Sequence, residues 1–138
     1  MIRKKRVWVN GCFDILHEGH FELLRFAATF GDVYIGIDTD LRVRKLKGPG
    51  RPVNNELFRA DILSELRFIK KVFIFDTDFE LRSIVKKIKP DFLVIGSDYK
   101  DKTIIGAESE KKIVFYEKTN HSTTSIIEKI KIRNEEAD

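Results

Sequence analysis

The chain has 138 residues, of which 42% are hydrophobic and 35% are charged, with a formal net charge of +4 at pH 7. This length and composition predict one soluble domain with a buried core, and no apolar run approaches the roughly 20 residues that span a bilayer. Cys12 is the single cysteine, which excludes an internal disulfide framework and a thiolate zinc cluster. The apolar stretch Val7–Val9 behind the basic start is too short for a secretory signal, so we expect a cytoplasmic protein.

Strand-length apolar runs alternate with helical patterns along the whole chain. The runs are mostly continuous and rich in Val, Ile, Phe and Tyr, which is typical of strands covered on both faces. In chain order we expect a strand at Arg6–Asn10, a helix at Phe21–Phe30, a strand at Val33–Ile37, a helix at Asn55–Leu66, a strand at Val72–Phe75, a helix between Asp78 and Lys89, strands at Phe92–Ile95 and Ile113–Tyr116, and a last helix that opens at Ser122 or Thr123.

The ends of these helices carry residues suited to capping. Asn54 and Asp78 are the expected N-caps of the second and third helices, and Gly31 is expected just after the first. The alternation of strands and helices predicts an α/β fold, a doubly wound five-stranded parallel sheet of the Rossmann-like kind. We expect a single domain over residues 1–132, followed by a frayed acidic tail over residues 133–138.

Polar residues follow four of the expected strands. These segments are His17–His20, Asp38–Asp40, Gly96–Tyr99 and Asn120–Thr124. Because the carboxyl ends of parallel strands meet at one edge of a sheet, the four segments are expected on the same rim, where open sheets of this kind bind ligands.

The sequence His17-Glu18-Gly19-His20 places two of the three histidines at the start of a helix. Backbone N–H groups there have no helical partner and the helix dipole is positive, so the turn is suited to a phosphate. The spacing differs from the His-x-x-x-His of helical zinc sites, and no further cysteine or clustered histidine completes a tetrahedron. We therefore expect a phosphate site without metal ligands from protein side chains.

Several further residues have a functional and a plain structural interpretation. Lys45 and Lys47 precede a Gly-Pro-Gly segment and could form a mobile basic flap over phosphates, although charge runs are usually solvated surface. Arg59 lies within a helix and could be exposed, or paired with Asp61 or Glu56. Cys12 is interpreted as a small packed residue rather than a nucleophile, because no partner histidine or orienting acid is specified for it.

Several motifs in order resemble the cytidylyltransferase-like branch of the nucleotidyltransferase superfamily. They include His-x-Gly-His within Gly-Cys-Phe-Asp-Ile-Leu-His, and the resemblance covers Val7 to about Ile130. Within that branch the chain is most similar to the adenylyltransferase domain of bacterial ADP-heptose synthases, and next to glycerol-3-phosphate cytidylyltransferases. The segments that carry the resemblance to the heptose enzymes are Leu46–Asn54, Gly96–Tyr99, Ile105–Glu108 and Ser122–Thr124.

The resemblance implies a role for each matching position. Its catalytic residues would be His17, His20, Lys47 and Arg59, with the lysine reaching the phosphates from its loop. Its nucleotide-binding residues would be Gly11, Cys12, Phe13, His17, His20, Asp98, Tyr99, Ser122, Thr123 and Thr124. Lys45 and Arg51 would lie on the substrate side, and Asp40 would stabilise its loop. Asp14 would support either the turn or the substrate side.

The implied reaction transfers a nucleoside monophosphate from an NTP, with ATP favoured, to a sugar phosphate such as heptose 1-phosphate, and releases pyrophosphate. Mg²⁺ would arrive with the nucleotide, and a homodimer is expected. A CTP-dependent enzyme acting on glycerol 3-phosphate is one alternative, and a nucleotide-binding module without catalysis is another. Nucleic acid is not an expected partner, because the basic run Arg42–Arg51 has no interleaved aromatic residues.

Overall fold

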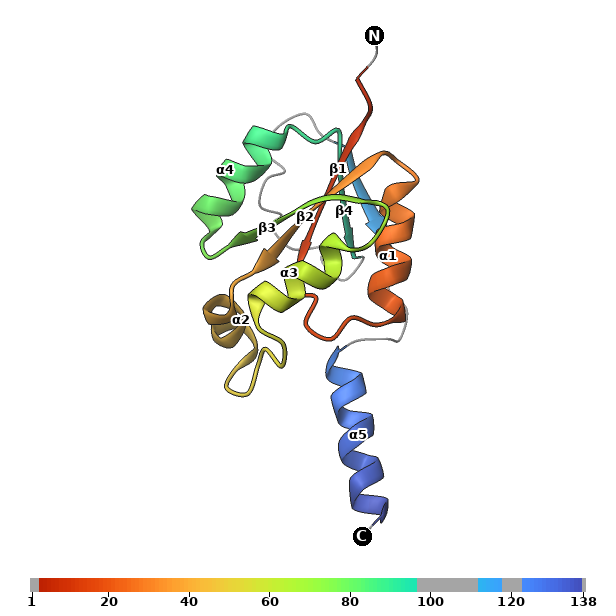
Figure 1. Ribbon diagram of the computed structural model, residues 1–138, viewed down its shortest axis with the longest axis vertical. Coiled ribbons are helices and arrows are strands. Elements are labelled where there is room, and N and C mark those ends of the chain that lie inside the picture. Colours follow the sequence, from red (N-terminus) through yellow and green to blue (C-terminus); the bar gives the residue numbers. More distant parts are fainter. Residues whose placement is uncertain (1–2, 97–111, 118–122, 138) are drawn as a thin grey trace.

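The computed structural model describes residues 3–96, 112–117 and 123–137. Its five strands are β1 (Arg6–Gly11), β2 (Asp32–Asp38), β3 (Ile69–Phe75), β4 (Phe92–Gly96) and β5 (Lys112–Tyr116). All neighbouring strands pair in parallel, in the order β3-β2-β1-β4-β5 (Figure 1). The predicted five-stranded parallel sheet is therefore confirmed, and the strand order reverses between β1 and β4.

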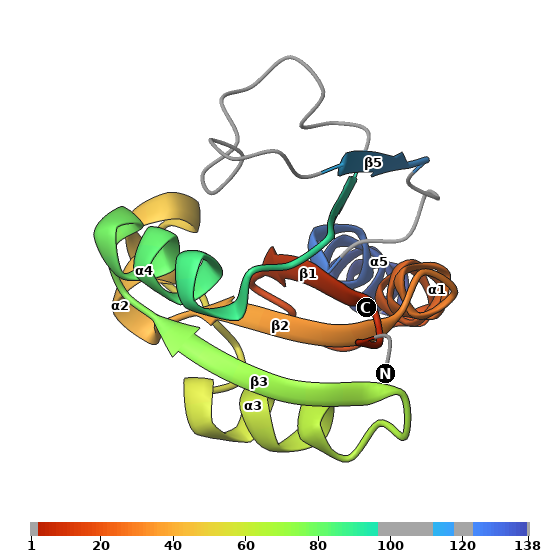
Figure 2. The same ribbon diagram turned by 90° about the horizontal axis from the view of Figure 1, so that it is seen from above.

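Helices cover both faces of the sheet, as a doubly wound fold requires. The helices are α1 (Glu18–Ala28), α2 (Asp40–Lys47), α3 (Glu56–Ser64), α4 (Asp78–Ile88) and α5 (Thr123–Ala137). Figure 2 shows α3 and α4 on opposite sides of β2 and β3. Among the described residues, no helix is long and apolar enough to cross a bilayer.

Alternating residues of β1 and β2 supply two separate cores. Val7, Val9 and their neighbours pack with Leu24 of α1 and Leu63 of α3 in one core. Trp8, from the opposite face, packs with α4 in the other core, through Leu81 and Val85. Each such side chain that leaves water contributes about 1.5–3 kcal/mol to folding. The burial therefore fixes β1 at the centre of the sheet and its carboxyl end at the rim.

Two expected helix caps are wrong by one residue. Asn55 caps α3, since its side chain accepts from the N–H of Phe58, and Thr77 caps α4 in the same way. Asn54 does not cap α3; its side-chain amide donates instead to the carbonyl of Asp14 at 2.9 Å. Asp78 is the first residue of α4, where its carboxylate faces the positive end of the helix dipole.

Gly31 lies three residues beyond Ala28, the last residue of α1, whose C-cap is Thr29. A Cβ at Gly31 would stand 2.3 Å from the carbonyl oxygen of Lys5, so the close approach of two backbones requires glycine there.

The basic segment before the Gly-Pro-Gly sequence is helical, which differs from the expected mobile flap. Thr39 caps α2, since its side-chain hydroxyl accepts from the N–H of Arg42. Within α2, the side chain of Val43 is buried. Lys45 and Lys47 lie in its last turn, at the negative end of the helix dipole. Helix α5 extends to Ala137, so residues 133–137 are helical where a frayed tail was expected; glutamate and alanine there are strong helix formers.

Candidate active site

The turn after β1 leads directly into α1 at the carboxyl edge of the sheet. Phe13 takes a left-handed backbone conformation with φ of 47°, which is uncommon for a bulky residue. Its ring is buried and lies 5.0 Å from the ring of His20, centroid to centroid. The ring also covers Gly11, where an added Cβ would stand 3.2 Å from it. The strained turn thus packs the start of α1 against the end of β1.

The two histidines form a reciprocal cap at the start of α1. Nδ1 of His17 accepts from the N–H of Gly19 at 3.1 Å, and Nδ1 of His20 accepts from the N–H of His17 at 3.3 Å. The rings are stacked, with centroids 3.7 Å apart and an angle of 22° between their planes. Because each Nδ1 is an acceptor, each neutral ring carries its proton on Nε2. The turn therefore presents two Nε2–H donors of fixed tautomer.

Arg59 is buried, and its guanidinium joins four separate segments. It donates to the backbone carbonyls of Cys12 at 2.9 Å, Asp38 at 2.8 Å and Asn54 at 2.9 Å. It also binds the carboxylate of Asp40 at 2.7 Å, and 0% of its side chain is exposed. The alternative of an exposed or locally paired arginine is wrong, since the partner comes from α2. The direct phosphate contact that the resemblance implies stays a prediction.

Asp14 is equally buried and accepts from the loop that joins α2 to α3, residues 48–55, here named the α2–α3 loop. Its carboxylate accepts from the N–H of Val53 at 2.8 Å and from the N–H of Asn54 at 2.8 Å. It also pairs with Nε of Arg51 at 3.2 Å, and none of the Asp14 side chain is exposed. These partners make Asp14 an anchor for the loop, and its substrate role stays a prediction, as does that of Arg51.

Cys12 lies half-buried between the end of β1 and the end of β2. Its thiol donates to the carboxylate of Asp38 at 3.3 Å. Burial, with the negative charge of Asp38 added, raises the pKa of Cys12 to about 12. The positive charges of Lys47 and Arg59 oppose this rise in the pKa of Cys12. A thiol of this kind is no nucleophile at neutral pH, in agreement with the sequence-based interpretation.

Cys12 is expected to resist alkylation in the folded protein. At pH 8 the native thiol stays protonated, whereas the unfolded thiol, with its ordinary pKa of 9.0, is partly ionised. Because the folded pKa is raised, the associated stability is complete below pH 9 and declines as the pH rises toward 12. Iodoacetamide labelling followed by mass spectrometry, with and without urea, measures the alkylation rate of Cys12 in the unfolded and the folded protein. Equal rates in both states would contradict the buried, protonated thiol.

Lys45 and Lys47 are exposed at the end of α2. Of the other predicted positions, Asp98, Tyr99 and Ser122 lie outside the described residues. Thr123 and Thr124 open α5, and only their backbone is described. Their contribution to nucleotide binding stays a prediction.

Two charged residues, Asp38 at the end of β2 and Arg42 in α2, have larger roles than the sequence indicated. Asp38 binds both the thiol of Cys12 and Nε of Arg42, the latter at 2.7 Å. Arg42 also forms an ion pair with Asp78 at 2.8 Å, and its guanidinium lies over the ring of Phe75. The position of Asp38 after a strand was the available signal, but its partners come from distant segments.

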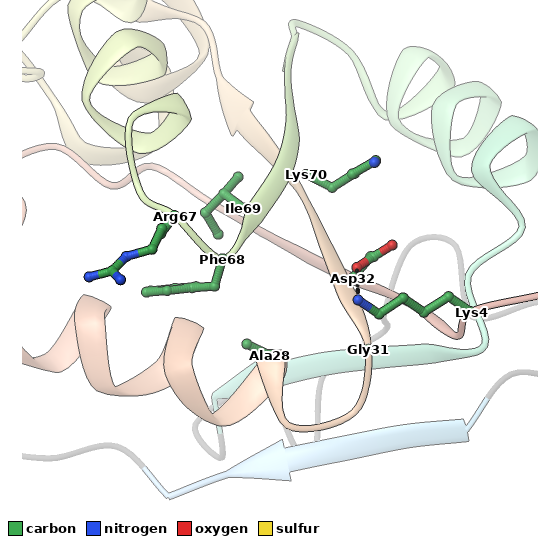
Figure 3. Close-up of a pocket in the computed structure, with 8 residues that line it drawn as sticks. All are labelled: Lys4, Ala28, Gly31, Asp32, Arg67, Phe68, Ile69 and Lys70. Carbon is green, nitrogen blue, oxygen red and sulfur yellow. Dashed lines mark ion pairs between the residues drawn. The ribbon is translucent and has the colours of Figure 1, made fainter.

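A hollow of about 220 Å³ lies at the opposite, amino-terminal edge of the sheet (Figure 3). The ion pair between Lys4 and Asp32, 3.1 Å long, crosses one side of it, and Arg67 and Lys70 line it as well. None of the predicted site residues whose side chains the structure describes lines this hollow. Several of them, including His17, Asp14 and Arg59, lie instead at the carboxyl edge, around the histidine turn.

The chain is similar to known proteins over most of its length. Residues 8–130 match the cytidylyltransferase-like family. The chain is 48% identical to the bifunctional protein HldE of Campylobacter jejuni subsp. doylei over 130 residues, which are 93% of this chain and 28% of that protein. It is 49% identical to the bifunctional protein HldE of Sulfurimonas denitrificans over 133 residues, which are 93% of this chain and 27% of that protein. The chain thus spans little more than a quarter of these relatives.

Solved structures show the same architecture. A lipopolysaccharide core biosynthesis protein from Thermoplasma volcanium superposes with a TM-score of 0.70 at 25% identity, covering 86% of this chain and 100% of that one. A pantoate-beta-alanine ligase from Francisella tularensis gives 0.55 at 18% identity, covering 96% of this chain and 71% of that one, and its likeness concerns the fold alone. From the matched residues 8–130 together with the sheet and the His-x-Gly-His turn, the chain belongs to the cytidylyltransferase-like family of nucleotidyltransferases.

Proposed function

We propose that this chain transfers a nucleoside monophosphate from an NTP to a sugar phosphate and releases pyrophosphate. The observation that carries the proposal is the reciprocal histidine cap at the start of α1, which fixes two Nε2–H donors at the carboxyl edge of the sheet. Anions bind at helix starts because the unpaired N–H groups and the dipole favour negative charge there. The triphosphate is assigned to this turn.

The chemistry needs little from the protein beyond position and charge. An oxygen of the acceptor phosphate attacks the α-phosphorus and forms a new P–O bond, while the bond to the β-phosphate oxygen breaks and pyrophosphate leaves with its electron pair. The acceptor is already an anion, so no general base is required. His17 and His20 stabilise the charge that develops on the α-phosphate, and Lys47 adds a positive charge from the end of α2. Mg²⁺ enters as part of the nucleotide substrate.

For the substrates we propose ATP and a heptose 1-phosphate. The resemblance to ADP-heptose synthases through the α2–α3 loop supports this choice, as does the identity of 45–49% with several proteins named HldE. CTP with glycerol 3-phosphate is the second candidate, because glycerol-3-phosphate cytidylyltransferases share the histidine motif. We further propose a cytoplasmic homodimer, which sedimentation velocity of the purified chain tests.

A pyrophosphate-release screen tests the proposed reaction. The four NTPs are each combined with heptose 1-phosphate, glycerol 3-phosphate and a panel of other sugar and polyol phosphates, with Mg²⁺ present. The proposal expects turnover with ATP and heptose 1-phosphate that exceeds every other pair. Highest turnover with CTP and glycerol 3-phosphate would replace the substrate assignment. Saturable nucleotide binding without pyrophosphate release from any pair would favour the non-catalytic module.

A further inference from the structure

The turn after β1 and the α2–α3 loop are joined by a closed circuit of buried polar contacts. The carboxylate of Asp14 accepts from the backbone N–H of Asn54, and Nε of Arg59 donates to the backbone carbonyl of the same residue. Arg59 then donates to the carbonyl of Cys12, two residues before Asp14 in the chain. The backbone of Asn54 is therefore held on both its N–H and its carbonyl, and its side-chain amide adds a bond to the carbonyl of Asp14.

The circuit leaves the two charged members no access to a ligand. None of the Asp14 side chain and none of the Arg59 side chain is exposed. Arg51, the ion-pair partner of Asp14, keeps 14% of its side chain exposed. The Asp14 carboxylate accepts from two backbone N–H groups and pairs with this arginine, so its burial is compensated by hydrogen bonds. The groups are thus committed to holding the protein's own backbone.

Both ends of the circuit lie close in sequence to the proposed phosphate ligands. Asp14 is three residues before His17, the N-cap of α1. The loop that the circuit holds starts at Gly48, directly after Lys47. Movement of the loop would change the position of Lys47 relative to the histidine turn.

We infer that Asp14 and Arg59 are positioning residues, which hold the α2–α3 loop on the histidine turn and so set Lys47 against the reacting phosphates. The inference rests on the proposed function for its catalytic part only. It differs from a direct role, in which these side chains would contact phosphate or acceptor. In transfer reactions a displacement of about 1 Å can lower the rate about 100-fold, so a positioning role predicts a large effect without any contact.

The first test is the variant Asp14→Asn with Asp91→Asn as its matched control. Asp91 also pairs with an arginine, Arg3, and accepts the backbone N–H of Arg6, but it lies at the amino-terminal edge of the sheet. In Asp14→Asn the amide cannot accept from every N–H that the carboxylate accepts, so the loop is released. We expect kcat to fall about 100-fold, with a much smaller change in the KM for NTP. Asp91→Asn is expected to keep kcat.

A second readout is independent of turnover. Trypsin cleavage at the Lys47–Gly48 bond is expected to accelerate in Asp14→Asn and to stay unchanged in Asp91→Asn, with circular dichroism showing that both are folded. Equal cleavage rates in both variants would overturn the inference. If wild-type protein releases no pyrophosphate from any substrate pair, the proposed function fails, and the trypsin comparison still decides whether the circuit holds the loop.

If Asp14→Asn does not fold, the variant Arg51→Met tests the same inference. It keeps the bonds from Val53 and Asn54 to Asp14 and removes the arginine alone. A positioning role predicts intermediate trypsin sensitivity with a lowered kcat. A raised KM for the acceptor with unchanged kcat and unchanged cleavage would instead identify Arg51 as a substrate contact and overturn the inference.

Discussion

Replacement of His17 by asparagine is expected to lower the rate of pyrophosphate release by about 100- to 1,000-fold, which is the usual effect of removing one donor to a developing anion. The fold should remain intact. The side-chain oxygen of asparagine occupies about the place of Nδ1 and is a good N-cap, so the bond from the N–H of Gly19 is kept. The Nε2–H donor is lost, together with the ring that stacks on His20. Initial rates at saturating NTP, with thermal unfolding of the same samples, measure both effects.

The matched variant His17→Gln separates the cap from the chemistry. The glutamine amide reaches about as far as Nε2 and can donate there, but glutamine is a weaker N-cap than asparagine. We expect His17→Gln to keep more activity than His17→Asn and to be less stable. If the order of activity were reversed, the histidine would act through the cap, and the assignment of Nε2–H to the phosphate would fail.

Replacement of Arg59 by methionine is expected to destabilise the fold by about 3–5 kcal/mol, because three backbone carbonyls lose their donor and each unsatisfied buried group costs about 1–3 kcal/mol. The change leaves the carbonyls of Cys12, Asp38 and Asn54 without this donor, and it leaves the carboxylate of Asp40 without its arginine. Each buried polar group that loses its partner contributes to the penalty. Urea unfolding followed by circular dichroism measures the change in the free energy of unfolding.

Arg3→Met is the control for this measurement. Arg3 also binds an aspartate, Asp91, but 49% of its side chain is exposed, and such pairs contribute about 0–1 kcal/mol. A variant Arg59→Met that is as stable as the wild type but inactive would show that Arg59 acts by contacting the ligand. That result would favour the role implied by the family resemblance over the structural one.

The central strands of this fold could be predicted because burial on both faces leaves a direct trace in the sequence, whereas β5 is largely exposed and was recognised by its apolar run alone. Each of the five is a run of apolar residues, and parallel strands separated by helices have few possible arrangements. Helix α2 could not be predicted in the same way, because among its residues only Val43 is buried and its remaining face is basic. Its cap, Thr39, is recognised only once Asp40 and Arg42 are known to continue as a helix.

The candidate site, too, could be predicted from the sequence only where its geometry is local. The histidine turn is local, and the spacing of His17 and His20 after a strand is sufficient to predict an anion site. Arg59 was predicted near the phosphates, and Asp14 at the turn or on the substrate side. In the structure, Asp14 accepts from the backbone N–H groups of Val53 and Asn54, 39 and 40 residues away in the chain. Arg59 donates to the carbonyl of Cys12, 47 residues away. No local pattern shows that the carbonyls of Cys12 and Asp38 meet beside one helix. Tertiary contacts decided these roles.

The central claim is that this chain transfers the α-phosphorus of a nucleotide to a phosphorylated acceptor. The most direct measurement follows ATP labelled at the α-phosphate through a reaction with heptose 1-phosphate, with products separated by chromatography and pyrophosphate measured in parallel. We expect the label to enter a nucleoside-diphosphate sugar, with one pyrophosphate released for each product formed. Label that stays in ATP, or that appears only as free nucleotide while the acceptor is unchanged, would contradict it.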